Sequence, residues 1–581
     1  MAGLFGDTFE INLNKKPSAR VLLDKLATAE SESEGDEIRL KILNSKTYTL
    51  ADKLSIINTR VLTVLGKQKN NVLVITDKDA LNNYIDKAIA YGRIAVDTET
   101  NNSTDPITCK LMGLCLYTPN EKQVYIPVNH IDFNTKQRIE PQLTEKDCAE
   151  ALQKIIDAKT YVVMHNGKFD YEVLKCTCGV EVVPNWDTLI GARLIDENKY
   201  SEKRTSLKYI YTTEIDPDQA KYDIGELFEN VPYEVVSPDI FALYAATDSM
   251  MTDKLYLWEK PFFEGEENAR LKWLAENVEM PIVQVTAEME LTGVCIDQEF
   301  GARLKIKYQK QLDDLDKAID AELDNLKDTI NTWKLSPEAN NRTRQYEPKK
   351  TKKTRDEIEE SYDLEDEDGR RYKLGKAAVE QLSEKINLAS PTQMAILFYD
   401  ILKAPVVDKK KPRGTGEDEL KAIAEKRPDI KLCSLLLERR GIVKLITTYI
   451  DVIPELAKHW PDGRIRYRLL SMGTDTGRFA SGGKFKFLND SGEPVVLNSI
   501  NSQNIPSHNP EIRMLFQAGT TYHKVEISDN YFEISQGDEV ETTVGWKNIK
   551  DLKIGDIVLG DNTNDTVKNI IQNDGKFFVY I

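Results

Sequence analysis

Strand-like and helix-like segments alternate from about residue 76 to residue 260, and this alternation constrains the fold more than any other feature. The runs NVLVIT and IAVDTET are short, apolar and bounded by polar residues, as buried strands are. Between them, DKDALNNYIDKAIAYG has the spacing of an amphipathic helix. GLCLYT and QVYIPVNH then predict a hairpin that extends the sheet. We therefore expect an α/β domain in this part of the chain.

Two acids, Asp97 and Glu99, end the strand IAVDTET. Side chains two residues apart on a strand face the same way, so both carboxylates should point to one place. A single pair of this kind is most often two ordinary surface acids. The pair indicates a functional site only in combination with the other acids of the domain.

Two further motifs contribute acids. In MHNGKFDYEVL, a helix that begins near Asn166 places Asp170 one turn on, although an Asn cap on an ordinary helix is the simpler interpretation. In YAATDSMMTDKLY, Tyr244 and Asp248 are four residues apart and share a helix face. Together the four acids offer oxygen ligands to two divalent cations, Mg²⁺ or Mn²⁺. Clustered carboxylates without a cation would repel one another, which favours a metal site.

The order of these motifs resembles the three exonuclease motifs of the proofreading domain in family A (polymerase I-like) DNA polymerases, in the tyrosine-bearing four-acid class. YIPVNH and WDTLIGARLIDENKYSEKRTSLKYI resemble the segments that accompany the motifs. The resemblance implies a ribonuclease H-like mixed sheet and a two-metal 3′→5′ exonuclease. It implies catalytic metal ligands at Asp97, Glu99, Asp170 and Asp248, a water-orienting Tyr244, and DNA contacts from Asn166 and Phe169.

The segment 263–453 is mainly helical in pattern, and several of its strings resemble the linker and thumb of the same family. They would also fit ordinary amphipathic core helices. Its polar stretch 336–372 predicts an exposed insertion or a disordered loop. The basic loop 403–416 predicts either a solvated connector or a phosphate-binding loop.

The blocks TGRFASGG and QNIPSHNPEIRMLF resemble the start of a family A palm. The resemblance places Arg478, Gln503 and Asn504 at the minor groove or phosphates of primer–template DNA. Such side chains can donate to minor-groove acceptors that all base pairs share. Arg478 and Gln503 are 25 positions apart, and an inserted hairpin containing KFKFLNDSGEPVV would explain this long spacing.

The rest of a polymerase site is not found in the sequence. Asp529 is the one positional candidate for the first palm aspartate, and none of the five histidines precedes an Asp-Glu pair. Instead, residues 537–562 resemble the opening strands of a Hint-type intein domain, with Ser528 and Ser535 as candidate nucleophiles. The positions that match the Hint pattern are Val540, Thr542, Gly545, Ile549, Leu552, Gly555, Asp556 and Val558.

Five regions are therefore expected: an N-terminal region of unknown role (1–75), the exonuclease domain (76–262), the linker and thumb-like region (263–453), the start of a palm (454–520) and a small β-rich Hint-like segment (521–581). The leading hypothesis is the N-terminal part of a phage-type family A DNA polymerase of DNA replication. It would have a proofreading exonuclease and an incomplete polymerase site. The alternatives are a free-standing 3′→5′ exonuclease, or a DNA-binding split-intein half that is inactive until a second polypeptide joins it.

Charge and composition limit the partners. A net charge of −17 argues against a protein that coats nucleic acid nonspecifically, although an enzyme can confine positive charge to a groove. The apolar runs are short and the first residues lack the pattern of a secretory signal. Seven cysteines, an odd number, favour a reducing compartment. We expect a cytoplasmic protein, in the host cytoplasm if it is phage-encoded, whose partner is DNA and not a membrane.

Overall fold

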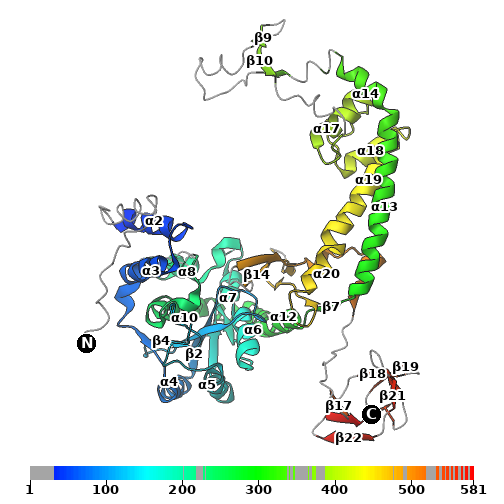
Figure 1. Cartoon of the computed structure of the whole chain (residues 1–581). Coiled ribbons are helices and arrows are strands. Elements are labelled where there is room, and N and C mark those ends of the chain that lie inside the picture. The colour runs from blue at the N-terminus through cyan, green and yellow to red at the C-terminus, as the bar shows by residue number, and fades with distance from the viewer. Residues whose placement is uncertain are drawn as a thin grey trace. The chain divides into compact units, whose positions relative to one another are not determined.

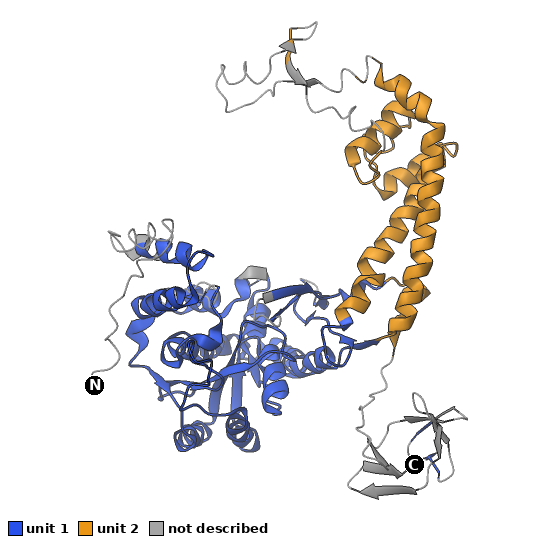
Figure 2. Cartoon of the chain, viewed as in Figure 1, with its two compact units in different colours: residues 1–295, 457–505, 518–581 blue, residues 296–456, 506–517 orange. Residues whose placement is uncertain are grey.

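The computed structural model divides the chain into two units (Figures 1 and 2). The first comprises residues 1–295, 457–505 and 518–581, and the second comprises residues 296–456 and 506–517. The structure describes residues 32–200, 202–217, 227–228, 230–336, 339, 344–346, 364–365, 369–374, 386–474, 477–488 and 494–517, together with short runs between 531 and 580.

A six-stranded mixed sheet forms the centre of the first unit, in the order β1-β4-β3-β2-β5-β6. Strands β2, β3 and β4 pair antiparallel, which confirms the predicted hairpin, whereas the pairs β1–β4, β2–β5 and β5–β6 are parallel. The α/β domain predicted from the alternating pattern is thus present. The strands are β1 (Val72–Val74), β2 (Arg93–Thr100), β3 (Leu111–Tyr117), β4 (Gln123–Pro127), β5 (Tyr161–Met164) and β6 (Trp186–Asp187).

Helices cover both faces of this sheet because the strands alternate their side chains between two cores. Ile94 and Val96 of β2 join one hydrophobic cluster with residues of α4, α5 and α6. Ala95 joins a different cluster that includes Tyr256 of α10. The helices are α4 (Lys78–Tyr91), α5 (Glu145–Asp157), α6 (Gly167–Cys178), α7 (Thr188–Ile195), α8 (Leu207–Glu214) and α10 (Pro238–Glu259).

The sequence led us to expect a separate N-terminal region up to residue 75. The structure differs from this expectation. Strand β1 precedes residue 76 and belongs to the six-stranded sheet. Helices α2 (Glu32–Leu43) and α3 (Leu50–Leu65) pack in one core with Phe241 of α10. The apolar stripe of α3 explains this, because Ile57 and Val61 on one helix face are fully buried there. Residues 1–31 lie outside the described part of the chain.

The segment 457–505 belongs to the first unit and is not a separate palm-like body. The Trp460 indole donates to Asp105 (3.2 Å), and the Thr104 amide donates to the Lys486 carbonyl (2.8 Å). Strands β14 (Lys484–Leu488) and β15 (Pro494–Asn498) pair antiparallel, which confirms the inserted hairpin. The unit also contains α12 (Met280–Thr292), β12 (Leu469–Leu470) and β13 (Ala480–Ser481).

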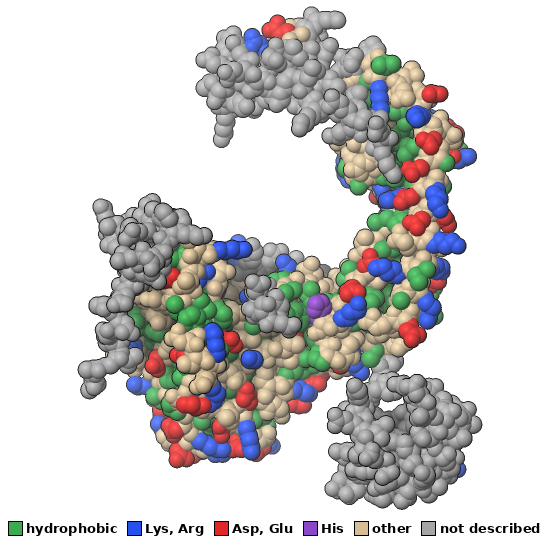
Figure 3. Space-filling model, viewed as in Figure 1, with side chains coloured by type: hydrophobic (Ala, Val, Ile, Leu, Met, Phe, Trp, Pro, Cys, Tyr) green, Lys and Arg blue, Asp and Glu red, His purple; other side chains and the backbone are tan. Residues whose placement is uncertain are grey.

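The second unit is mainly helical, as predicted. Trp333, Phe398 and Leu436 share its hydrophobic core. On the face shown in Figure 3, acidic and basic side chains are interspersed along its helices. Arg413 of the basic loop is paired with Asp400 at 2.6 Å. Its helices include α13 (Gln298–Asn325), α14 (Lys327–Lys334), α17 (Pro391–Ala395), α18 (Glu417–Lys426) and α19 (Leu432–Leu445).

Most of the described residues between 531 and 580 are in strands, from β17 (Tyr531–Ser535) to β23 (Lys576–Tyr580). They form a three-stranded and a four-stranded sheet. The Hint assignment stays a prediction, because several of its residues lie outside the described part of the chain, as does most of the predicted insertion 336–372. The undescribed residues include Ser528, Asp529, Ile549, Gly555 and Asp556. Within the described residues, no helix combines the length and hydropathy needed to cross a membrane. All seven cysteines are free thiols.

Candidate active site

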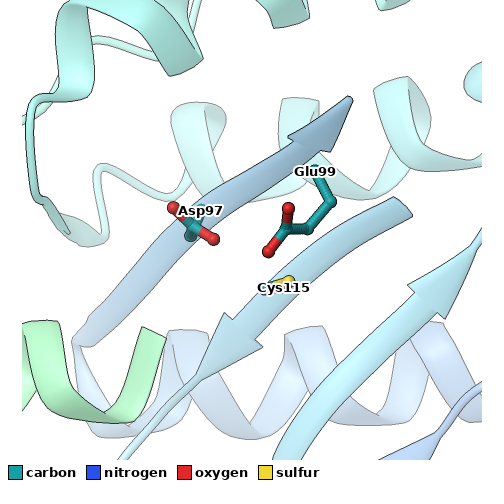
Figure 4. Close-up of side chains that lie close together, drawn as sticks. All are labelled: Asp97, Glu99 and Cys115. Carbon is teal, nitrogen blue, oxygen red and sulfur yellow. The ribbon is translucent and has the colours of Figure 1, made fainter. Parts of the chain in front are cut away.

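Strand β2 directs Asp97 and Glu99 to the face that α10 covers. Ala95 of the same strand packs in one cluster with Tyr256 of α10. Alternate residues of a strand share a face, so Asp97 and Glu99 face the same way as Ala95. The nearest carboxylate oxygens of Asp97 and Glu99 lie within 4.8 Å of each other, and both lie within the same distance of the Cys115 Sγ (Figure 4). The spacing in IAVDTET therefore predicted the placement of the two carboxylates correctly.

Helix α6 brings Asp170 to the same strand. Its Oδ1 accepts hydrogen bonds from the backbone amide of Thr98 (2.8 Å) and from the Thr98 hydroxyl (2.7 Å). Asn166 does begin this helix, but its side chain makes no capping bond. It adopts a left-handed conformation (φ 58°), and its backbone N–H donates to Asp187 Oδ1 (3.0 Å). The simpler interpretation of Asn166 as an ordinary side-chain cap is therefore wrong.

Helix α10 presents Tyr244 and Asp248 one turn apart, and both contact Lys208 of α8. The Lys208 ammonium donates to the Tyr244 hydroxyl (2.7 Å) and to Asp248 Oδ2 (2.9 Å). It also lies 3.9 Å from the centre of the Tyr244 ring. Lys208 was not predicted from the sequence. Its one local signal is its position two residues after Ser206, the cap of α8, and that signal does not relate it to the acids.

Burial raises the pKa of the acids of β2 and α6. The pKa of Asp97 lies well above its usual range, and the charges of Asp170, Glu99 and Asp248 raise it further. Burial raises the pKa of Glu99 to about 8 and that of Asp170 to about 7, although the hydrogen bonds from Thr98 oppose the second shift. The positive charge of Lys208 lowers the pKa of Asp97 and Glu99 without cancelling these effects.

The donor set fits divalent cations. Glu99 is only 8% exposed, and neither Glu99 nor Asp97 accepts a side-chain hydrogen bond within the described residues. A buried carboxylate without partners is costly, and a nearby cation would offset that cost. Carboxylate oxygens suit Mg²⁺ and Mn²⁺. The four acids could thus hold such ions.

The remaining predicted residues of this domain, Asn166 and Phe169, lie at the start of α6, the helix that carries Asp170. Phe169 is half-buried and packs against the hydrophobic core on the α6 side of the sheet. Asn166 is exposed and lines a cavity of about 480 Å³ together with Lys168, Arg193 and residues 469–473. None of the four candidate metal ligands lines this cavity.

Arg478, Gln503 and Asn504 form a second group, on the segment 477–505, and all three are exposed. The Ser481 and Ser502 hydroxyls lie 2.8 Å apart, and the Ser502 amide donates to Ser481 Oγ (3.0 Å). These bonds bring the T-G-R and Q-N-I-P blocks together across the inserted hairpin.

Two known families match parts of this chain. Residues 72–258 match a family described as 3′-5′ exonuclease, and residues 360–531 match DNA polymerase family A. The chain is similar to the family A DNA polymerases. The exonuclease match spans the sheet and α10, and so includes all four acids.

Individual relatives are distant in sequence. DNA polymerase I of Treponema pallidum is 25% identical over 516 residues, which cover 81% of this chain and 42% of that protein. The DNA polymerase of Bacillus phage SP01 is 24% identical, over 78% of this chain and 49% of that protein. The chain thus spans less than half of the length of these relatives. A solved structure, the POL domain of Pol1 from M. smegmatis in complex with DNA primer-template and dNTP, aligns with a TM-score of 0.49 and 17% identity, over 79% of this chain and 60% of that one.

Proposed function

We propose that this chain removes nucleotides from the 3′ end of DNA as a proofreading 3′→5′ exonuclease. The observation that carries the proposal is the pair of unpartnered carboxylates of half-buried Asp97 and buried Glu99, beside Cys115 on the face that α10 covers. Two cations, Mg²⁺ or Mn²⁺, would be held by Asp97, Glu99, Asp170 and Asp248. When bound, they would polarise the phosphodiester and stabilise the charge that develops on the leaving 3′ oxygen.

The chain's own residues prepare the site for hydrolysis. Thr98 fixes Asp170 against the strand through two hydrogen bonds. Lys208 holds the Tyr244 hydroxyl in place, and this hydroxyl would orient the attacking water. The low exposure of Glu99 and Asp170 strengthens their interaction with any bound cation.

DNA is the proposed substrate and partner. Asn166 and Phe169 would contact the single-stranded primer 3′ end, since both lie at the start of the helix that carries Asp170. Arg478, Gln503 and Asn504 would contact the primer–template duplex, for which their exposure and donor groups are suited. The family A match over residues 360–531 supports the second assignment.

We propose that residues 454–520 contribute primer–template contacts, and that the polymerase site is incomplete in this sequence, where no histidine precedes an Asp-Glu pair. A second polypeptide, joined through the Hint-like segment, would supply what is missing. The phage polymerase among the relatives supports a phage-type enzyme of DNA replication.

The decisive experiment measures Mg²⁺-dependent shortening of a 5′-labelled single-stranded oligonucleotide by the full chain. Asp97→Ala should lower the rate by about a hundredfold or more, because it removes a ligand of the charge-stabilising cations. Asp79→Ala is the matched control, since Asp79 is an exposed acid of α4 outside the site. Thermal unfolding of both variants checks that the fold is retained.

Shortening by Asp97→Ala at the rate of the Asp79→Ala control would refute the assignment of the acids. If the unmutated chain shortened no oligonucleotide in Mg²⁺ or Mn²⁺, the DNA-binding precursor would be the better hypothesis. A chain that trims DNA but shows no preference for primer–template duplex would favour a free-standing exonuclease.

A further inference from the structure

Cys115 lies beside Asp97 and Glu99, although none of the three acidic motifs includes it. It stands on β3 directly opposite Asp97 in the antiparallel pair β2–β3. Opposed residues of such a pair share a face of the sheet, and so does Glu99, two residues after Asp97. Figure 4 shows the sulfur next to both carboxylates, with all three donor atoms within 4.8 Å of one another. The thiol therefore lies on the same face of the sheet as the two acids.

The spacing of these three atoms suits an ion that accepts sulfur. Zinc binds thiolate sulfur at about 2.3 Å and carboxylate oxygen at about 2.0–2.2 Å, so donors at tetrahedral angles around one ion lie about 3.5 Å apart. The three donor atoms lie within 4.8 Å of one another, so they would have to approach by at most about 1 Å to share one ion. One sulfur and two oxygens form a three-ligand set that leaves a fourth position for water.

Burial alone would account for a small thiol at this position. Cys115 is fully buried and shares a hydrophobic core with Tyr125 and Phe241. What burial does not explain is the neighbouring Glu99, which is more than nine-tenths buried and accepts no side-chain hydrogen bond within the described residues. A bound cation would stabilise this buried carboxylate, and the Cys115 thiol is close enough to bind the same cation.

We propose that Cys115 is a third protein ligand of this site, through which thiophilic cations such as Zn²⁺ and Cd²⁺ bind in competition with Mg²⁺ and inhibit the enzyme. The predicted inhibition rests on the proposed exonuclease function, whereas the predicted binding of the cation by Cys115 does not. On binding, the S–H bond breaks, an S–metal bond forms and the proton passes to solvent, without oxidation or reduction. Mg²⁺ prefers oxygen ligands and retained waters, and so leaves the thiol protonated.

The binding test uses the full chain, stripped of metal, in a Cys176→Ser/Cys178→Ser background. This background removes Cys176 and Cys178, which are two residues apart in the sequence and could bind cadmium themselves, since Cys176 is exposed. Titration with Cd²⁺ is followed by the thiolate-to-cadmium charge-transfer absorption. We expect one equivalent to produce the band and Cys115→Ser to abolish it. Cadmium affinity should fall more than about a hundredfold, because loss of even an outer-shell partner costs roughly 10–100-fold.

Cys433→Ser is the matched control, since Cys433 is another fully buried cysteine, in the core of the helical unit. It should leave the band unchanged. An undiminished band in Cys115→Ser, or no band in the parent, would overturn the proposal. X-ray absorption at the cadmium edge of the parent protein gives an answer that does not depend on the folding of a variant: a sulfur neighbour supports the proposal and an all-oxygen shell refutes it.

The activity test separates this inference from the proposed function. The Cd²⁺ concentration that halves Mg²⁺-dependent trimming, measured relative to each variant's own uninhibited rate, should rise at least tenfold in Cys115→Ser. If the chain trims DNA and this concentration does not change, the role of Cys115 is refuted while the exonuclease stands. If the chain trims nothing, the cadmium band and the edge spectrum still decide the ligand assignment.

Discussion

Lys208 and Asp248 form an ion pair across 40 residues of sequence, with Nζ 2.9 Å from Oδ2. Both side chains are largely buried, with exposures of 10% and 14%. The same ammonium donates to the Tyr244 hydroxyl. One lysine thus fixes a candidate metal ligand and the candidate water-orienting group at the same time.

We predict that Lys208→Met lowers the kcat of oligonucleotide trimming by roughly 10–100-fold, as loss of a group that orients a ligand does. The KM for DNA should change much less, because Lys208 contacts the side chains of the site and is itself mostly buried. Steady-state kinetics at saturating Mg²⁺ measures both. Lys208→Arg, which can still donate to both partners, should retain part of the rate. A kcat equal to that of the unmutated chain would show that Lys208 has only a structural role.

A second buried cluster joins the segment 457–505 to helix α6. Arg468 lies 2.7 Å from Glu172 and 2.9 Å from Glu290, whose exposures are 0% and 3%. It also donates to the Thr104 carbonyl (2.9 Å), and Lys168 binds Glu290 as well. Even beside this guanidinium, burial raises the pKa of Glu172 to about 8.

Arg468→Met should therefore destabilise the first unit by about 3–5 kcal/mol, because it leaves a buried carboxylate without its counter-charge. The measurement is chemical unfolding followed by tryptophan fluorescence. Adding Glu172→Gln to Arg468→Met should recover much of the loss. Arg427→Met removes a largely exposed pair with Asp429 and should cost no more than about 1 kcal/mol. Equal losses for the two arginine variants would contradict the prediction.

His130 gives the folded protein a defined response to acid. Its Nδ1 lies 2.9 Å from the Val236 carbonyl, which can only accept, so Nδ1 carries the proton and Nε2 accepts from the Tyr125 hydroxyl (2.6 Å). Burial lowers the pKa of His130 from 6.5 to about 4. Between pH 6.5 and 4 the unfolded chain therefore binds a proton that the folded chain does not.

The contribution of His130 to stability is thus fully present above pH 6.5 and is lost as the pH falls through 4, by roughly 3 kcal/mol. His130→Gln should be less stable at pH 7, and its stability should fall less steeply between pH 6.5 and 4. Comparing the two slopes isolates His130 from Glu99, Asp170 and Glu172, whose raised pKa values act in the opposite direction. Parallel slopes would show that His130 is not the titrating group.

Spacing within one element was enough to predict much of the candidate site. Asp97 and Glu99 share a face because covalent geometry turns every second residue of a strand the same way. Tyr244 and Asp248 share a face because a helix repeats every 3.6 residues. The hairpin that contains Lys484–Leu488 followed from a single gap between two motifs. The boundary at residue 76 was wrong because the packing of α3 on α10 is a tertiary contact.

Contacts between elements could not be predicted in the same way. Cys115 faces Asp97 only through the register of β2 and β3, which depends on the connection between them and on which face becomes buried. Arg468 reaches Glu172 across 296 residues, and no periodicity relates them. The sequence by itself determined which acids this chain carries and how they are spaced on each strand or helix. Only the tertiary structure decided which cation, thiol and carbonyl lie beside them, because strand order and core packing depend on the whole chain at once.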